Sequence, residues 1–572
     1  MPAGVNNSFA NGQSADLIIK NAKIITCDVH ASIHQAISVK NGRILAIGNE
    51  CKVSETTNTR SRVIDARGAA VIPGMIDGHA HLDREGLKRI FPSLAGSQSI
   101  DDILQRIEAL VKDADPGDWI VTMPIGEPPF YFDVPGNLRE KRLPTRWELD
   151  KVSPNNPVYI RPIWGFWSHI QPLDSIANSR ALEEAGLNRI PKNCPNNIKF
   201  EINHTTGEPN GIIHEMTFMP IAELLWFQTM KRFSHDNRVK GIKDAMRAYN
   251  ASGTTSVFEE HGCAQEVIDA WKAVNNSGDA TVRAHLIYSP SWQFAEKNDF
   301  AGAIKRWSND LSGMKGSGDD YLRIGGIFGD LGIDPDAAAR LTAAPYTGWS
   351  GFNYDSGIPA ENMHEFLIAA AQHNVRVSAI WMTMLPFFEA VNAEFSIKEQ
   401  RWVIGHLGYA TPQEIKRLAD IGVTMTAHTN RYIFKNGHAI IEDMGPENEN
   451  NLCPMKSVLE QGIHIGLASD NVPTTLWYPV WEAVTRHNLY IDGPVAREQA
   501  LTRQQALNCA TIEGAYLTGE ENEKGSLEVG KLADIVILTD DPLTCAENKI
   551  KEIMATITIV NGEIVYDSEG VT

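Results

Sequence analysis

Two histidines separated by one residue follow an apolar run near the start of the chain. The stretch from Val71 to Leu82 reads VIPGMIDGHAHL, and its imidazoles are His79 and His81. Because side chains alternate along an extended strand, these two face the same way. Neutral imidazole nitrogens are common ligands of divalent metal ions. The spacing therefore predicts that both residues bind one metal ion at the end of a buried strand. The alternative interpretation is a pair of surface histidines on a loop.

Three further polar side chains end apolar runs in the second half of the chain. Asp470 ends HIGLASD (464–470), His406 lies in RWVIGHLG (401–408) and His428 in GVTMTAHT (422–429). A carboxylate at such a place can bind a metal ion with one oxygen and take a proton from water with the other. Asp470 would otherwise be a helix N-cap beside Ser469. A single histidine at a strand end is also a common core residue.

The run PGMIDGHAHL resembles the first-strand motif of the amidohydrolase superfamily of metal-dependent hydrolases. Two other segments, WSHIQPLDSIANSRALEEAGL (167–187) and TGEPNGIIHE (206–215), resemble the amidohydrolase-3 or YtcJ-like branch, which carries an inserted subdomain there. The resemblance extends from about Asp16 to Tyr566. It implies a metal site with these ligands: His79, His81, His406 and Asp470. It also implies that Asp470 moves the proton and that His406 ligates metal or polarises a substrate carbonyl.

Other residues are candidates for substrate binding. His169 matches a histidine that relatives place before the NS-x-AL motif, and His428 ends the predicted seventh strand. Trp381 stands near the end of the predicted fifth strand, so it indicates an apolar or aromatic substrate. Structural roles for His169 and His428 are the alternative.

The chain departs from the family at two ligand positions. Relatives often carry a lysine on the fourth strand, whereas LRIGGIFGDLG (322–332) has none. They also end the fifth strand with a histidine, where VRVSAIWMTM (375–384) has Ile380 or Trp381. Three outcomes follow. The site holds one metal ion on His79, His81, Asp470 and water; or replacement ligands come from VFEEHG, with these candidates: Glu259, Glu260 and His261; or the metal is lost, leaving a binding or regulatory protein.

The elements that must position these residues alternate between apolar strand-like runs and helical stretches. Examples of the helical stretches are 360–374 and 412–421. Such alternation over several hundred residues predicts an α/β fold with a (β/α)8 TIM-like barrel, whose reactive groups lie at the C-terminal ends of the strands. An open doubly wound sheet is the alternative, but no Gly-rich dinucleotide loop opens a helix.

Both ends of the chain read as short strands broken by Asn-Gly or Arg-Gly turns. We therefore predict a small composite β-sandwich of residues 16–73 and 520–572, and a hydrolase barrel of residues 74–519. An inserted subdomain at about 90–240 interrupts the barrel, since this part is rich in Pro, Trp and Asn and does not alternate cleanly. Residues 1–15, which are polar, small and uncharged, predict a disordered tail.

Composition limits the partners. The 572 residues carry 52 basic and 71 acidic side chains, a net charge of −19, which argues against nucleic acid or an anionic membrane. No apolar run is long enough to span a bilayer, and the start lacks a secretory signal. Seven scattered cysteines suit a reducing cytoplasm. A small molecule is the expected partner, and a homodimer is left open.

The sequence thus predicts a metal-dependent hydrolase that uses metal-activated water. Zinc or another divalent metal ion, one per chain, is the expected cofactor. The resemblance implies cleavage of a carbon–nitrogen bond other than a peptide bond, such as an amide, formamide, carbamate or cyclic imide, in a small apolar or aromatic substrate. Two alternatives remain: a metal-dependent lyase, isomerase or decarboxylase, and a ligand-binding or regulatory homologue that has lost catalysis.

Overall fold

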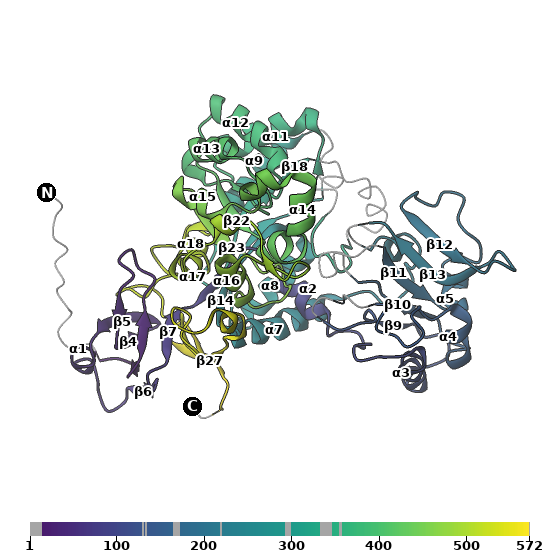
Figure 1. The fold of residues 1–572 in the computed structure, drawn as a ribbon, viewed down its shortest axis with the longest axis horizontal. Coiled ribbons are helices and arrows are strands. Elements are labelled where there is room, and N and C mark those ends of the chain that lie inside the picture. The colour runs from purple at the N-terminus through teal and green to yellow at the C-terminus, as the bar shows by residue number, and fades with distance from the viewer. Residues whose placement is uncertain are drawn as a thin grey trace.

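Eight parallel strands from the middle of the chain form a barrel (Figure 1). The computed structural model describes residues 14–128, 131, 134–163, 172–217, 220–291, 299–331, 346–353 and 357–570. In sheet order the strands are β8 (Met75–Asp77), β14 (Thr254–Cys263), β15 (Arg283–Tyr288), β17 (Leu322–Phe328), β20 (Val377–Ala379), β21 (Val403–Ile404), β22 (Thr424–Ala427) and β23 (Ile465–Leu467). The N–H of Gly78 donates to the carbonyl of Leu467 at 2.8 Å, which joins the two edges. The predicted (β/α)8 barrel is confirmed.

Helices surround the barrel and connect its strands. They include α7 (His235–Ala251), α8 (Gln265–Asn276), α9 (Phe300–Leu311), α11 (Ala360–Gln372), α12 (Leu385–Glu394) and α13 (Pro412–Ile421). Local sequence explains the bounds of α13. Thr411 accepts from the N–H of Glu414 at 3.2 Å, the Glu414 carboxylate accepts from the N–H of Thr411 at 2.8 Å, and Pro412 opens the first turn. Gly422, at φ 72°, ends the helix in the left-handed conformation.

Apolar side chains fill the interior of the barrel. The cluster consists of Phe258, Ile287, Phe328, Ile380 and Val403, each from or next to a different strand. The strands therefore lie between this interior and the outer helices, and both of their faces are buried. This explains why the sequence shows them as continuous apolar runs without strict alternation.

Strands from both ends of the chain share one sheet beside the barrel. Its order is β28 (Glu563–Asp567), β27 (Ala555–Val560), β26 (Ile535–Leu538), β7 (Ala70–Pro73), β2 (Lys23–Ile25) and β3 (Ile33–His34). A second sheet has the order β5 (Arg43–Gly48), β4 (Ala36–Lys40), β1 (Leu17–Lys20) and β6 (Arg62–Asp65). One apolar cluster, which includes Leu17, Ile37 and Ile535, draws on both sheets. Only Gly74 separates β7 from barrel strand β8.

Between β8 and β14 the chain forms a separate mixed sheet, drawn at the right of Figure 1. Its order is β12 (Ile198–Ile202), β13 (Pro209–Glu215), β11 (Leu173–Ala177), β10 (Val158–Ile160) and β9 (Ile120–Thr122), with α3 (Ile100–Lys112), α4 (Arg146–Val152) and α5 (Ser179–Glu184) beside it. Most pairs in this sheet are antiparallel, which explains why the sequence lacks strand–helix alternation here. The domain division at residues 73 and 519 stays a prediction, and residues 1–13 of the predicted tail lie outside the described residues.

A close helix crossing fixes the chain just after the two N-terminal histidines. Helix α2 (Leu82–Leu87) follows His81 directly and packs on α7. A Cβ on Gly86 would overlap the backbone of Gly241, so only glycine allows this approach. The segment that carries His79 and His81 therefore lies between β8 and this packed helix.

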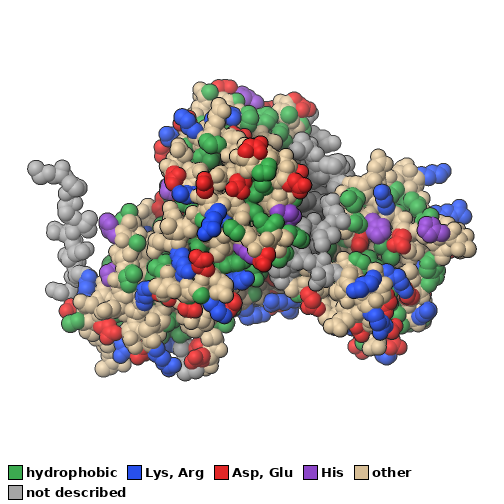
Figure 2. All heavy atoms as spheres, in the orientation of Figure 1, with side chains coloured by type: hydrophobic (Ala, Val, Ile, Leu, Met, Phe, Trp, Pro, Cys, Tyr) green, Lys and Arg blue, Asp and Glu red, His purple; other side chains and the backbone are tan. Residues whose placement is uncertain are grey.

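The surface carries charges of both signs. Acidic and basic side chains are interspersed over the face shown in Figure 2. Among the described residues, no helix has the length and hydropathy that crossing a membrane requires.

His285, inside the barrel wall, gives a test of how burial couples stability to pH. Its side chain is 1% exposed, and its Nε2 lies 3.1 Å from the carbonyl of Gly325. Burial, assisted by Arg376, lowers its pKa to about 3. The unfolded chain therefore binds the extra proton first, and stability should fall as the pH drops below about 6.5.

We expect His285→Gln, which keeps an N–H donor, to reduce this pH dependence by up to about 1.4 kcal/mol per pH unit between pH 6 and 5. Denaturant unfolding at pH 7, 6 and 5 measures the effect. The half-buried His464, changed in the same way, serves as the control. Parallel pH curves for wild type and His285→Gln would contradict the expectation.

Candidate metal centre

One rim of the barrel gathers the polar side chains that end the strands. His79 and His81 follow β8, Glu260 lies on β14, and a second group follows the last three strands: His406, His428 and Asp470. All eight strands are parallel, so their C-terminal ends meet at the same rim. The structure thus brings together residues that are almost 400 positions apart in the sequence.

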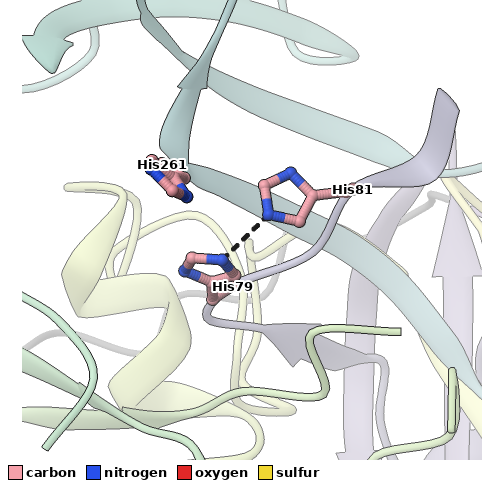
Figure 3. A group of neighbouring side chains, drawn as sticks. All are labelled: His79, His81 and His261. Carbon is pink, nitrogen blue, oxygen red and sulfur yellow. Dashed lines mark hydrogen bonds between the residues drawn. The ribbon is translucent and has the colours of Figure 1, made fainter. Parts of the chain in front are cut away.

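His79 and His81 point their Nε2 atoms toward each other. These nitrogens are 2.9 Å apart, as the dashed line in Figure 3 shows. Asp470 Oδ1 lies 3.7 Å from the Nε2 of His79 and 3.6 Å from that of His81. Two imidazole nitrogens and one carboxylate oxygen therefore converge on one point, within the reach needed to share an ion.

Three more imidazoles surround this point. The rings of His428 and His406 lie 4.5 and 5.0 Å from that of His79, centre to centre. His261, on β14, lies 6.2 Å from His79 and 6.1 Å from His81, turned toward them in Figure 3. The histidines form two overlapping triads, His79–His81–His261 and His79–His406–His428. Within each triad the ring nitrogens lie within 4.8 Å of one another.

Glu260 orients His79 from behind. Nδ1 of His79 donates to Oε2 of Glu260 at 2.6 Å, and the Thr426 hydroxyl donates to the same oxygen at 2.7 Å. A Cβ at Gly405 would overlap this carboxylate, so the glycine before His406 makes room for it. Because Nδ1 holds the proton, Nε2 of His79 presents its lone pair to the centre.

Glu259 holds a similar place behind His81. Its Oε2 lies 3.2 Å from Nδ1 of His81, and its Oε1 accepts from the N–H of Leu82 at 2.9 Å. Of the three replacement ligands that the sequence offered, Glu259 and Glu260 thus lie behind the rings. The third, His261, faces the centre and forms a triad with His79 and His81.

Hydrogen bonds fix the two loops that carry the ligands. The N–H of Asp470 donates to the carbonyl of His79 at 2.9 Å. The Asn471 side chain accepts from the N–H of His81 at 2.9 Å and donates to its carbonyl at 2.8 Å. Asp77 accepts from the N–H groups of His79 and Ser469 at 3.1 and 3.0 Å. These contacts connect the start of the barrel to its last strand.

His406 and Asp470 both have left-handed backbone conformations, at φ 50° and 48°. For residues other than glycine this conformation costs about 1–3 kcal/mol. At these two positions it turns the chain away from the strand direction directly at the rim.

Burial keeps the imidazoles neutral. It lowers the pKa of His79 to about 4 and that of His428 to about 3, and it holds the pKa of His81 and of His406 well below the usual range. Neutral imidazole is the form that binds a metal ion. A set of imidazole nitrogens with one carboxylate is the ligand chemistry that zinc and similar divalent ions prefer, so the residues present fit such an ion.

The two departures from the family are visible in the structure. Strand β17 carries no lysine. After β20, Ile380 packs in the barrel interior, whereas Trp381 is 36% exposed with its ring 5.7 Å from that of His406. Trp381 and His428 therefore lie beside the centre, and their role in substrate binding stays a prediction. His169 lies outside the described residues.

Sequence reasoning missed how several neighbours of the centre act. Glu260 was predicted as a possible ligand but contacts Nδ1 of His79, and the roles of Thr426 and Asn471 were not predicted at all. The signal for Glu260 was its place in the VFEEHG run.

Changing Glu260 to glutamine should weaken the centre without unfolding the barrel. The amide keeps the shape of the side chain but lowers the basicity of His79, and changes behind a metal ligand typically reduce metal affinity about 10- to 100-fold. Competition with a chelator measures this affinity. Glu513→Gln is a matched control, because Glu513 accepts from His464 Nδ1, also at 2.6 Å, away from the rim. Equal affinities in the two variants would count against the role of Glu260.

Comparisons with known proteins bear on the family and the fold. The model of the amidohydrolase family matches residues 62–566. N-substituted formamide deformylase of Arthrobacter pascens is 26% identical, covering 98% of this chain and 99% of its own length. Putative amidohydrolase YtcJ of Bacillus subtilis is 22% identical, covering 93% and 96%. In fold, the chain is similar to the crystal structure of an uncharacterized metal-dependent hydrolase from Pyrococcus horikoshii, with a TM-score of 0.65 and 19% identity over 93% of this chain and 99% of that one.

Proposed function

Because the chain belongs to the amidohydrolase family, whose members act on carbon–nitrogen bonds other than peptide bonds, we propose that it hydrolyses such a bond in a small apolar or aromatic molecule with the help of a bound divalent metal ion. The observation that carries this proposal is the convergence of His79, His81 and Asp470. Their ligand atoms come from the first and last barrel strands and lie within 3.7 Å of one another.

His79, His81 and Asp470 would hold the ion, with His406 beside them. Zinc or a similar ion bound there lowers the pKa of a coordinated water toward neutrality. One ion per chain agrees with a fourth barrel strand that offers no bridging lysine. His261 and His428 complete the two overlapping triads, and each is a candidate for one more ligand.

Asp470 would transfer the proton, and His406 would stabilise the negative charge that develops on the substrate. The second carboxylate oxygen of Asp470 takes a proton from the attacking water and later gives it to the leaving nitrogen. His406, neutral because it is buried, donates a hydrogen bond to the oxygen of the carbonyl under attack as negative charge develops there. Burial of both groups strengthens these interactions.

Aromatic side chains support an apolar or aromatic substrate. Trp381 lies against His406, and Phe352 stacks on His261 with ring centres 3.9 Å apart and lies 6.0 Å from His81. The relative named N-substituted formamide deformylase supports a formamide as the first compound class to test.

The test combines metal analysis with product analysis. We expect about one divalent ion per chain by elemental mass spectrometry and release of formate from N-phenylformamide. In oxygen-18 water the formate should gain one solvent oxygen, since hydrolysis adds water to the carbonyl. A product free of solvent oxygen would show that the protein catalyses an elimination or isomerisation instead of hydrolysis. Protein that binds no metal and turns over no member of an amide, carbamate and imide panel would favour a ligand-binding role.

A further inference from the structure

A short segment between barrel strands β17 and β20 contacts the metal centre through one aromatic ring. It consists of residues 346–353, and its Phe352 is buried. The ring of Phe352 stacks on that of His261, with centres 3.9 Å apart and planes inclined by 28°. Phe328, the last residue of β17, also contacts His261, at 4.8 Å between ring centres. The direction of the His261 ring, which Figure 3 shows turned toward the other two histidines, therefore depends on where this segment lies.

Arg238, on α7, anchors the 346–353 segment. Its side chain is fully buried, and its Nη2 donates to the carbonyl of Gly348 at 2.8 Å and lies 3.3 Å from the hydroxyl of Thr347. Nη2 also donates to Oε1 of Glu266 at 2.7 Å, and this carboxylate oxygen accepts from the N–H of Thr347 at 3.0 Å. Glu266 lies in the first turn of α8, five residues after His261. Arg238 thus joins the segment to the chain that follows His261.

The other side of the same guanidinium contacts the helix that follows His81. Nη1 of Arg238 donates to Oδ2 of Asp83 at 2.7 Å, and Asp83 lies on α2, two residues after His81. A Cβ on Gly351 would lie 2.7 Å from this carboxylate oxygen, so the segment and α2 are in close contact there. The carbonyl of Gly351 accepts from the N–H of Ala264 at 2.9 Å, directly after β14. Arg238 therefore connects three pieces of chain, and each of them adjoins a histidine of the centre.

The geometry of this network requires a guanidinium. A planar guanidinium donates to Asp83 and to Gly348 at the same time, whereas the ammonium of a lysine is a single point charge that cannot reach both. The attraction within a buried ion pair is largely offset by the cost of removing its charges from water, so stability alone does not explain the network. We propose that Arg238 is a positioning residue, which sets the direction of the His261 ring, and with it the geometry of the metal site, through Phe352. This inference rests on the metal-dependent function proposed above.

Loading the full chain with cobalt(II) tests this proposal without a measurement of activity. The visible absorption of the ion depends on the number and arrangement of its ligands. We expect His261→Ala to change this spectrum, and Arg238→Lys to change it in the same direction and to lower the affinity for cobalt(II) about 10- to 100-fold. Arg283→Lys is the matched control and should keep the wild-type spectrum and affinity. Arg283 is also buried, and it pairs with both carboxylate oxygens of Asp534 at the strand end opposite the rim.

A further variant separates the network from the ring that it holds. Phe352→Leu removes the stack on His261 but leaves Arg238 with all its partners, so it should reproduce the spectral change even if Arg238→Lys does not fold. A wild-type spectrum in His261→Ala, Arg238→Lys or Phe352→Leu, or an equal change in Arg283→Lys, would overturn the inference while the metal centre stands. Wild-type protein that binds no cobalt(II) would overturn the proposed function and this inference together.

Discussion

Replacing His79 with alanine should remove the bound metal and lower kcat/KM by at least about a thousandfold. His79 belongs to both histidine triads and is fixed by Glu260, so no other described imidazole takes its place. Loss of a ligand should lower metal affinity by more than the roughly 10- to 100-fold expected for a change behind a ligand. Elemental analysis and steady-state kinetics on the same preparation measure both effects.

His464→Ala is the control for this experiment. His464 directly precedes β23, at the strand end opposite the rim, and pairs with Glu513. We expect it to keep its metal and its activity. A His79→Ala protein with full metal content would mean that the ion lies elsewhere. Full metal loss in His261→Ala or His428→Ala would show which triad supplies the additional ligand.

Asp470→Asn should separate metal binding from proton transfer. The amide oxygen can still face His79 and His81, but the side chain no longer accepts a proton from water. We expect kcat to fall about 10²- to 10⁴-fold, the range typical of a removed general base, while metal content stays close to that of the wild type.

Asp470→Ala gives the contrast, because it removes both functions and should lower metal content as well as kcat. Both variants alter a residue with φ 48°, so their melting temperatures must be compared with that of the wild type. Retention of more than about a tenth of wild-type kcat in Asp470→Asn would assign the proton transfer to another group.

The sequence allowed the barrel and the rim position of several polar residues to be predicted for physical reasons. Buried parallel strands read as short apolar runs, and a polar residue that ends such a run must lie at the rim. His79, His406 and Asp470 could therefore be expected at the same rim, whereas their role as one ligand set was implied by the family resemblance. The prediction used side-chain direction only once, in the alternation along a strand that makes His79 and His81 face the same way.

Side-chain direction explains what the sequence did not reveal. Glu259, Glu260 and His261 are adjacent on β14, yet the first two lie behind His81 and His79 while the third faces the centre. Strand β14 extends through Cys263, and its pairing with β15 shifts register between Glu259 and Cys263. Such a shift cannot be read from residue types.

The direct passage from β7 into β8 has a consequence for the order in which the enzyme matures. Strand β7 pairs with β26, where Ile72 lies opposite Val536, so residues made late in translation support the strand that leads to His79 and His81. A nascent chain that has released the whole barrel still lacks this support. Acquisition of the metal ion should therefore come after translation has passed residue 538, however early the ligands themselves leave the ribosome.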